Sequence, residues 1–208
     1  MVLQENNKLL SIIIPAYNEQ DNIHRTFNTI SQILNESHIP FEILFVDDGS
    51  RDMTWPRICE LSAGLSEAKG ISFSRNFGKE SAIFAGLESA SGACCVIMDC
   101  DLQHPPAVIP KMYRLWQEGF EVVEGVKASR GQENPFHTFC AKGFYKIISR
   151  VTKVNMSDAS DFKLLDRKAV DALLLLPERA PFFRALSSWV GFRTASVPFE
   201  VQERAIGS

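Results

Sequence analysis

Hydrophobic residues along the first 127 positions follow two alternating patterns. Short unbroken apolar runs predict strands that are buried on both faces, as in parallel sheets. Between these runs, apolar residues recur every three or four positions, which predicts helices with one buried face. The expected strands lie within 9–19, 41–50, 69–76, 93–101 and 120–127, and the expected helices within 20–37, 54–64, 78–91 and 105–119.

This alternation predicts an α/β fold with a mostly parallel sheet and helices on both of its faces. In such sheets, ligands bind outside the carboxyl ends of the strands. A polar cluster follows each of the first four expected strands: "PAYNE", "VDDGS", "SRNFGK" and "DCDLQH". We therefore expect these four clusters to converge on one site.

The pattern changes after the fifth expected strand. Segment 128–139 is polar and contains Gly and Pro, which favours a loop. Segment 139–154 mixes apolar residues with Lys and Arg. It predicts either a helix packed on the core or a basic amphipathic helix lying on a membrane surface. A short strand and then a helix beginning near Asp166 are expected within 160–178, and a last strand within 192–204.

The composition is that of a globular domain: 208 residues, of which 45% are hydrophobic and 23% charged. The formal net charge of −3 gives no reason to expect a nucleic-acid partner. The N-terminus lacks the apolar segment of a signal peptide, and no apolar run reaches the roughly 18–20 residues of a membrane span. The five cysteines show no C-x₂-C pair, so we expect small buried thiols rather than a zinc site.

Two carboxylates, Asp99 and Asp101, stand at the end of the fourth expected strand. Side chains two apart on an extended segment point the same way, so both acids can face one point. They would repel each other unless a cation lies between them, and oxygen-only ligands suit Mg²⁺ or Mn²⁺. Gln103, again two residues on, could supply a third oxygen. The sequence therefore predicts a metal and nucleotide site, with an acidic loop that binds nothing as the alternative.

Asp47 and Asp48 precede a glycine at the end of the second expected strand. An acid at this place in a doubly wound fold commonly accepts hydrogen bonds from a ribose or a base. The alternative is turn formation alone, because Asp-Gly favours turns. Neither a G-x-G-x-x-G fingerprint nor a P-loop occurs in the chain, which disfavours a dinucleotide-dependent oxidoreductase and a P-loop NTPase.

Five strings carry a family resemblance: "SIIIPAYNE", "FVDDGSRDMT", "SRNFGKESAIFAGL", "MDCDLQHPP" and "DFKLLDR…LPER…SSWVGF". The chain resembles the inverting family 2 glycosyltransferases of GT-A type over residues 9–207, and within them the polyprenyl-phosphate branch, which includes dolichol-phosphate mannosyltransferase and the undecaprenyl-phosphate sugar transferases. The resemblance implies one Rossmann-like catalytic domain, 1–208. Residues 1–127 would bind the nucleotide-sugar and metal, and residues 128–208 the acceptor.

The resemblance also implies residue roles. Cys100 stands where the family often has Ala, and Lys163 where an Arg is common, which removes the bidentate fork of the guanidinium. Asp99, Asp101, Lys127 and Arg130 are the expected catalytic residues. The expected donor contacts are Pro15, Tyr17, Glu19, Val46, Asp48 and Cys100; the metal ligands are Asp99, Asp101 and Gln103; the acceptor-phosphate cations are Lys127, Arg130, Lys163 and Arg204.

The implied reaction moves a sugar from a UDP- or GDP-sugar to a polyprenyl phosphate at the cytoplasmic face of the membrane, with Mg²⁺ or Mn²⁺. A phosphate acceptor needs no protein base, because it is already largely ionised at pH 7. Two alternatives stay open: a saccharide hydroxyl acceptor, with Asp158 or Asp161 as base, and a non-catalytic nucleotide-sugar scaffold. The sequence also leaves open the formation of homo-oligomers.

Relatives in this branch often continue past the position of Arg204 into two membrane helices. We therefore expect a membrane anchor to be absent from this chain. The helix expected at 139–154 would then lie near the bilayer, with Phe136 and Phe139 close to the lipid acceptor.

Overall fold

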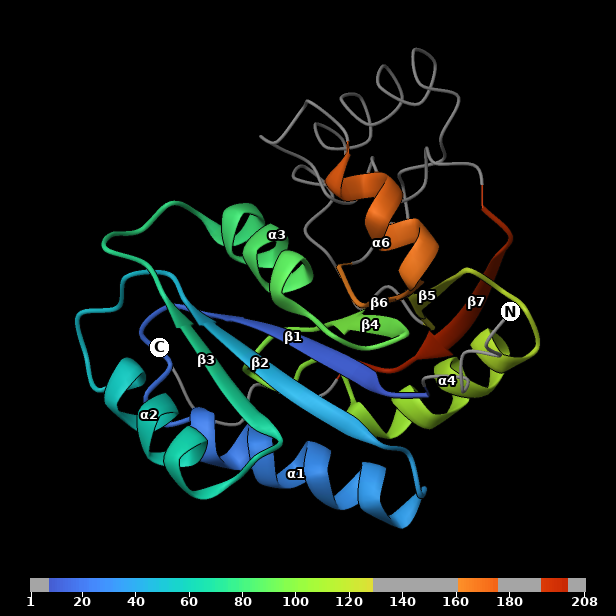
Figure 1. The fold of residues 1–208 in the computed structure, drawn as a ribbon. Coiled ribbons are helices and arrows are strands. Elements are labelled where there is room, and N and C mark those ends of the chain that lie inside the picture. The colour runs from blue at the N-terminus through green and yellow to red at the C-terminus, as the bar shows by residue number, and fades with distance from the viewer. Residues whose placement is uncertain (1–7, 129–160, 176–191, 202–208) are drawn as a thin grey trace, which may run out of the picture.

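A seven-stranded sheet forms the centre of the molecule (Figure 1). The computed structural model describes residues 8–128, 161–175 and 192–201. The strand order is β3-β2-β1-β4-β6-β5-β7, and β6 runs antiparallel to both of its neighbours while the other pairs are parallel. The strands are β1 (Leu10–Ala16), β2 (Phe41–Asp47), β3 (Ala68–Ser72), β4 (Cys94–Ile97), β5 (Val122–Lys127), β6 (Lys163–Asp166) and β7 (Thr194–Phe199).

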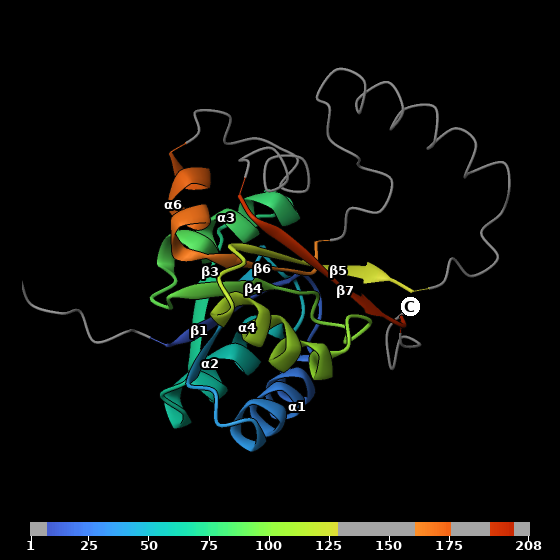
Figure 2. The ribbon, with the colours of Figure 1, turned by 90° about the vertical axis from the view of Figure 1, so that its right-hand side faces the viewer.

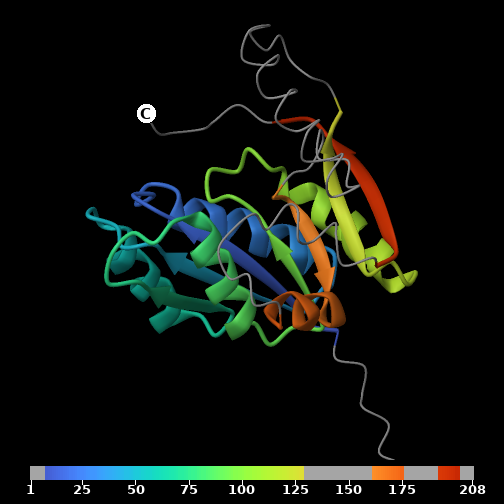
Figure 3. The ribbon, with the colours of Figure 1, turned by 90° about the horizontal axis from the view of Figure 1, so that it is seen from above.

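Helices cover both faces of this sheet, as Figure 3 shows from above. Helices α1, α2 and α4 pack with one core cluster on one face, and α3 and α6 pack with a second cluster on the other. The helices are α1 (Ile23–Glu36), α2 (Thr54–Gly64), α3 (Lys79–Ser89), α4 (Ile109–Gln117) and α6 (Arg167–Leu174), with a short 3₁₀ turn, η1 (Pro106–Val108), before α4.

The packing of the central strand β1 explains why nearly all of its residues are apolar. Ile12 and Ile14 belong to the core on the α1 side, whereas Ile13 belongs to the core on the α3 side, and all three are fully buried. Alternate side chains of a strand point to opposite faces, so a strand covered on both faces favours apolar residues at successive positions. The polar exception, Ser11, is also buried, and its hydroxyl donates to Glu42 Oε1 at 2.5 Å. The α/β, mostly parallel fold expected from the sequence is confirmed.

The antiparallel strand β6 joins the two parts of the sheet. It lies between β4 and β5, with Leu164 opposite both Val96 and Val123. Beyond β5, strand β7 forms the edge of the sheet, and Figure 2 shows these two strands side by side. Helix α6 follows β6 directly, and Asp166 caps it by accepting a hydrogen bond from the backbone N–H of Lys168 at 2.9 Å. The helix start expected near Asp166 is thus confirmed.

Two expectations need correction. The fourth strand was expected within 93–101, but it ends at Ile97, so Asp99 and Asp101 lie in a turn after the strand. The expectation of buried thiols holds for Cys94, Cys95 and Cys100, whereas Cys59 is exposed on α2.

The loop expected at 128–139 and the basic helix expected at 139–154 lie almost wholly outside the described residues. In the part of the chain that the structure describes, no helix combines the length and apolar character needed to cross a bilayer.

Candidate active site

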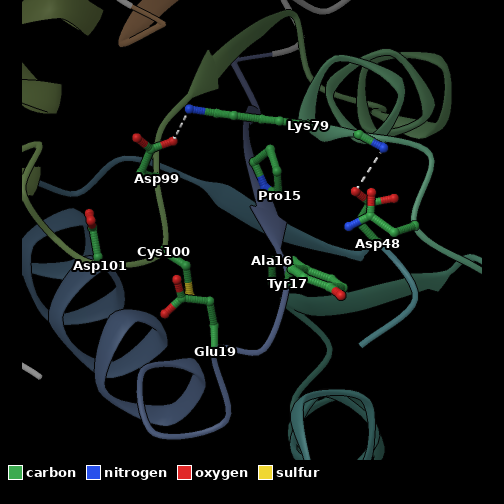
Figure 4. A pocket seen from close by; sticks show the side chains of 11 residues that line it. Pro15, Ala16, Tyr17, Glu19, Asp48, Lys79, Asp99, Cys100 and Asp101 are labelled. Carbon is green, nitrogen blue, oxygen red and sulfur yellow. Dashed lines mark hydrogen bonds and ion pairs between the residues drawn. The ribbon is translucent and has the colours of Figure 1, made fainter. Parts of the chain in front are cut away.

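A pocket of about 370 Å³ opens at the carboxyl ends of β1, β2 and β4 (Figure 4). Each of the four polar clusters that follow the first four strands contributes to its wall, which confirms that they converge on one site. The sheet therefore brings together acids, an amide, an aromatic ring and a lysine from segments far apart in the sequence. The lining residues are Pro15, Ala16, Tyr17, Glu19, Asp48, Asn76, Gly78, Lys79, Asp99, Cys100 and Asp101.

The loop after β1 is fixed by hydrogen bonds to the loop after β2. The backbone N–H of Asn18 donates to Ser50 Oγ at 2.9 Å, and the backbone N–H of Arg51 donates to Asn18 Oδ1 at 2.9 Å. Glu19 is held in the same way, because its N–H donates to Thr54 Oγ1 at 2.8 Å. These bonds keep the segment that carries Tyr17 and Glu19 at the wall of the pocket.

Asp48 holds the loop after β3 in place at the pocket. Its carboxylate accepts hydrogen bonds from the backbone N–H groups of Phe77, at 2.7 Å, and Gly78, at 2.9 Å. Its neighbour Asp47 instead accepts from the N–H of Ser50 and the hydroxyl of Ser72, both at 3.1 Å. Turn formation thus describes Asp47, whereas Asp48 both holds the 76–79 loop and lines the pocket.

Gly49 allows these two loops to approach each other. It adopts a φ of +70°, and a Cβ atom added there would overlap the backbone of Arg75. Only glycine combines this backbone conformation with such a close contact. The glycine of "VDDGS" therefore brings the loop after β3 against Asp48.

The turn after β4 presents Asp99 and Asp101 to the pocket, with Cys100 between them (Figure 4). The hydroxyl of the buried Thr26 on α1 donates to the carbonyl oxygen of Cys100 at 2.6 Å. Asp101 Oδ1 also accepts from the backbone N–H of Gln103 at 3.1 Å. The geometry of a turn held by α1, rather than the alternation of a strand, therefore turns both acids to one cavity.

His104 contacts both the acidic turn and the aromatic core. Its Nδ1 accepts a hydrogen bond from the backbone N–H of Asp99 at 3.3 Å, and its ring stacks on Phe162 with 5.1 Å between centroids. Burial lowers the pKa of His104, and nearby Asp99 opposes this effect only in part. A neutral imidazole is the form that can accept the bond from Asp99. Sequence reasoning gave no role to this histidine.

Lys79, the first residue of α3, is the basic residue among the described residues that line the pocket. Its Nζ lies 2.5 Å from Asp99 Oδ1 and 2.9 Å from Asp161 Oδ2. Burial acts to lower the pKa of Lys79, but the two carboxylates outweigh it and raise that pKa. Sequence reasoning did not single out Lys79, although it ends the "SRNFGK" cluster that was expected at the site.

Several predicted residues lie away from the lining of the pocket. Val46 is fully buried within β2, and Gln103 is next to the acidic turn. Lys127 is exposed at the end of β5, whereas Lys163 is fully buried, with Nζ 2.9 Å from Glu124 Oε1. The roles given to these residues stay predictions. Outside the described residues lie Arg130, Phe136, Phe139, Asp158 and Arg204.

The pocket suits a hard cation that keeps open coordination positions. Asp99 and Asp101 offer carboxylate oxygens, the ligands that Mg²⁺ and Mn²⁺ prefer. Burial raises the pKa of the Cys100 thiol, so this side chain stays protonated and is no thiolate ligand. Among the described residues, no group of three or more His, Cys, Asp or Glu side chains is arranged to hold a metal.

Residues 11–174 match the family model described as Glycosyl transferase family 2. The chain belongs to glycosyltransferase family 2. It is 40% identical over 199 residues to an uncharacterised glycosyltransferase of Synechocystis, covering 95% of this chain and 63% of that protein. It is 35% identical over 199 residues to the bactoprenol glucosyl transferase of Shigella phage SfV, covering 95% and 65%. The chain thus spans a little under two thirds of the length of these relatives.

Two solved structures share the fold of this chain. The complex of Mycobacterium tuberculosis glucosyl-3-phosphoglycerate synthase with Mn²⁺, UDP and glucosyl-3-phosphoglycerate has a TM-score of 0.64 at 21% identity, covering 97% of this chain and 73% of that chain. The Pyrobaculum calidifontis mannosyltransferase PcManGT with GDP-Man and Mn²⁺ has a TM-score of 0.62 at 19% identity, covering 92% and 55%. These likenesses confirm the GT-A type of α/β fold.

Proposed function

We propose that this family 2 chain is the catalytic domain of a metal-dependent, inverting glycosyltransferase. It moves a sugar from a UDP- or GDP-sugar to a polyprenyl phosphate at the cytoplasmic face of a membrane. The observation that carries the proposal is that Asp48, Asp99 and Asp101 line one pocket. The 35% identity to a bactoprenol glucosyl transferase supports the choice of a polyprenyl acceptor.

The donor half of the reaction follows from the pocket. Tyr17, Asp48, Asp99 and Asp101 all line it. We assign Tyr17 and Asp48 to the nucleoside, and Asp99 and Asp101 to the metal that binds the diphosphate. A Mg²⁺ or Mn²⁺ ion held by these two acids, with Gln103 as a further oxygen ligand, would neutralise the leaving diphosphate. Two solved structures of the same fold contain Mn²⁺ with a nucleotide, which supports a divalent metal here.

The acceptor half needs cations rather than a base. A phosphate monoester has a second pKa of about 6, so it is largely dianionic at pH 7 and can attack directly. Attack from the face opposite the diphosphate inverts the anomeric carbon. Lys127, Arg130 and Arg204 would position the acceptor phosphate. Lys163 would act from within the sheet, where it pairs with Glu124.

A second candidate is transfer to a saccharide hydroxyl. Asp161 is the described carboxylate that could serve it, because it lies beside the pocket, 2.9 Å from the ammonium of the lining residue Lys79. A hydroxyl acceptor requires a base, and a carboxylate at this place could serve as one. Product analysis with undecaprenyl phosphate and with an oligosaccharide as competing acceptors separates the two reactions.

The first test is calorimetric titration with UDP, GDP and CMP, each with and without Mn²⁺. One nucleotide should bind only with metal, and Asp101→Ala should weaken that binding about a hundredfold, because a direct metal ligand is lost. The control is Asp171→Ala, which removes an exposed acid on α6 whose side chain is 61% exposed. Equal binding of every nucleotide with and without Mn²⁺ would contradict the metal site.

The second test is transfer itself. Labelled sugar should move to undecaprenyl phosphate, a chelator should stop the reaction, and added Mn²⁺ or Mg²⁺ should restore it. Metal-dependent nucleotide binding without transfer to any acceptor would instead favour a non-catalytic nucleotide-sugar scaffold.

A further inference from the structure

Lys79 bridges two acids that come from different parts of the chain. Asp99 follows β4, and Asp161 lies just before β6, 82 residues after Lys79. Figure 4 shows Lys79 reaching from α3 across the pocket to Asp99. The single ammonium therefore contacts a proposed metal ligand and a second carboxylate at the same time.

The Lys79–Asp99 contact reduces the repulsion between carboxylates in the acidic pocket. Neighbouring carboxylates repel one another unless a positive charge lies among them. The ammonium of Lys79 lies 2.5 Å from Asp99 Oδ1, so the chain supplies such a charge itself. A divalent ion that binds Asp99 must therefore bind a carboxylate whose Oδ1 is already in contact with the Lys79 ammonium.

We infer that Lys79 is the resident counter-ion of Asp99, and that it competes with a divalent metal for this carboxylate. The inference rests on the proposed function in that Asp99 is taken as a metal ligand. Asp161 gives Lys79 a second partner, so metal binding does not leave the ammonium unpaired. The pocket without a donor then holds metal weakly, and the donor diphosphate adds the negative charge that strengthens metal binding.

The test is a Mn²⁺ titration without nucleotide, followed through the paramagnetic resonance signal of free Mn²⁺. Lys79→Met keeps the length of the side chain and removes its charge. We expect it to lower the Mn²⁺ dissociation constant about tenfold, because a repelling charge is lost within a few ångströms. Lys79→Arg keeps the charge and should stay within about threefold of the wild type.

Lys69→Met is the matched control. Lys69 also pairs with a carboxylate at 2.5 Å, but its partner is Glu42. Glu42 lies near the amino end of β2, whereas the pocket lies at the carboxyl ends of the strands. The loss of Lys69 should leave the Mn²⁺ affinity unchanged. An equal or weaker Mn²⁺ affinity in Lys79→Met would overturn the inference. If Lys79→Met does not fold, as judged by circular dichroism, Lys79→Gln takes its place.

A double-mutant cycle tests the part played by Asp161. Asp161→Asn leaves Lys79 with Asp99 as its carboxylate partner, so Mn²⁺ binding should weaken. In the Lys79→Met background the same change should have little effect, because the competing ammonium is gone. An equal loss of affinity in both backgrounds would mean that Asp161 acts on the metal directly, and would overturn its role as second partner.

Failure of the inference can be told apart from failure of the proposed function. Mn²⁺ binding that depends on Asp101 but not on Lys79 overturns the inference alone. No Mn²⁺ binding in any variant, with or without UDP or GDP, overturns both the inference and the metal dependence of the proposed function.

Discussion

The carboxylate of Asp48 accepts a hydrogen bond from the backbone N–H of Gly78 at 2.9 Å, across 30 residues of sequence. Its other oxygen accepts from the N–H of Phe77 at 2.7 Å. Asp48→Asn would turn an amide N–H₂ toward one of these N–H groups, and two donors cannot bond. We expect a loss of about 1–3 kcal/mol in the free energy of unfolding, and nucleotide affinity at least about tenfold weaker. Urea denaturation and calorimetric titration measure the two effects.

Asp47→Asn is the control for this change. At that position one oxygen accepts from a backbone N–H and the other from the hydroxyl of Ser72, and a hydroxyl can also accept a bond. The amide can therefore keep both contacts, and stability and nucleotide affinity should change little. Equal losses of stability and nucleotide affinity in the two variants would show that both effects come from removing a negative charge. They would contradict a specific role of the hydrogen bonds from Asp48 to the 76–79 loop.

Thr26 and Cys100 give a second prediction. The Thr26 hydroxyl donates to the Cys100 carbonyl at 2.6 Å in a buried setting, and Thr26→Val keeps the shape but removes the donor. The unpaired carbonyl should cost about 1–3 kcal/mol of unfolding free energy. Because the turn also carries Asp99 and Asp101, Mn²⁺ affinity should fall as well. Urea denaturation and a Mn²⁺ titration check both expectations.

Thr29→Val, on the same helix, separates this effect from a general response of α1. The Thr29 hydroxyl donates to the carbonyl of Arg25, one turn earlier, and the residue is partly exposed. The carbonyl of Arg25 keeps its access to water or its helical partner, so little stability should be lost. A similar drop in Mn²⁺ affinity for both variants would argue against a specific role of Thr26.

The sequence predicted the first half of the fold well because burial there repeats along the chain. Residues 10–14 of β1 are all buried, and four of the five are apolar, so this stretch reflects the packing of both faces of the strand. The four polar clusters likewise mark strand ends, and the geometry of a parallel sheet makes them meet. The antiparallel course of β6 has no such local signal, because direction depends on how the chain returns to the sheet.

The missed residues of the site depend on contacts between distant segments. Lys79 meets Asp161 across 82 residues, and His104 stacks on Phe162. A lysine at the start of a helix and a histidine in a turn are common, and nothing in their own segments shows which partner they will find. Asp48 was found because an acid at a strand end has a known geometric meaning in this class of fold.

Glu42 gives a prediction of pH dependence far from the pocket. Burial raises the pKa of this carboxyl, but Lys69, Ser11 and Ser91 outweigh it and lower the pKa below its ordinary value of 4.5. A lowered pKa in the folded state adds stability that is present above pH 4.5 and is lost as the pH falls through the folded value. At pH 7, the free energy of unfolding of Glu42→Gln should therefore be about 1–3 kcal/mol lower than that of the wild type.

The difference between wild type and Glu42→Gln should shrink as the pH drops below 4.5, because the unfolded chain then binds a proton at Glu42 while the folded carboxyl, with its lowered pKa, still resists protonation. Urea denaturation at pH 7, 5 and 3.5 follows this change. Glu60→Gln is the control, because Glu60 pairs with Arg57 on the surface and should hardly affect the unfolding midpoint. A difference that persists unchanged at pH 3.5 would contradict the ionised hydrogen-bonded role of Glu42.

Gly86 sets how closely α3 packs on the sheet. A Cβ atom added there would overlap Cγ2 of Ile13 and lie 3.3 Å from Cγ2 of Val46. Alanine favours a helix over glycine by about 1 kcal/mol, but forcing a methyl group into a filled core costs about 1–3 kcal/mol or more. Gly86→Ala should therefore destabilise the protein in urea denaturation, despite its better helix propensity.

The same substitution should also be felt in the pocket, because α3 carries Lys79 in its first turn. A helix pushed away from β1 and β2 moves the Lys79 ammonium relative to Asp99, so the Mn²⁺ affinity should change together with stability.

Gly64→Ala, at the end of α2 with no atom within 4 Å of the added carbon, is the control. It should leave stability unchanged or raise it by at most about 1 kcal/mol, with no effect on Mn²⁺ binding. A stabilised Gly86→Ala would show that α3 can move outward without strain, and would argue against close packing as the device that holds Lys79 at Asp99.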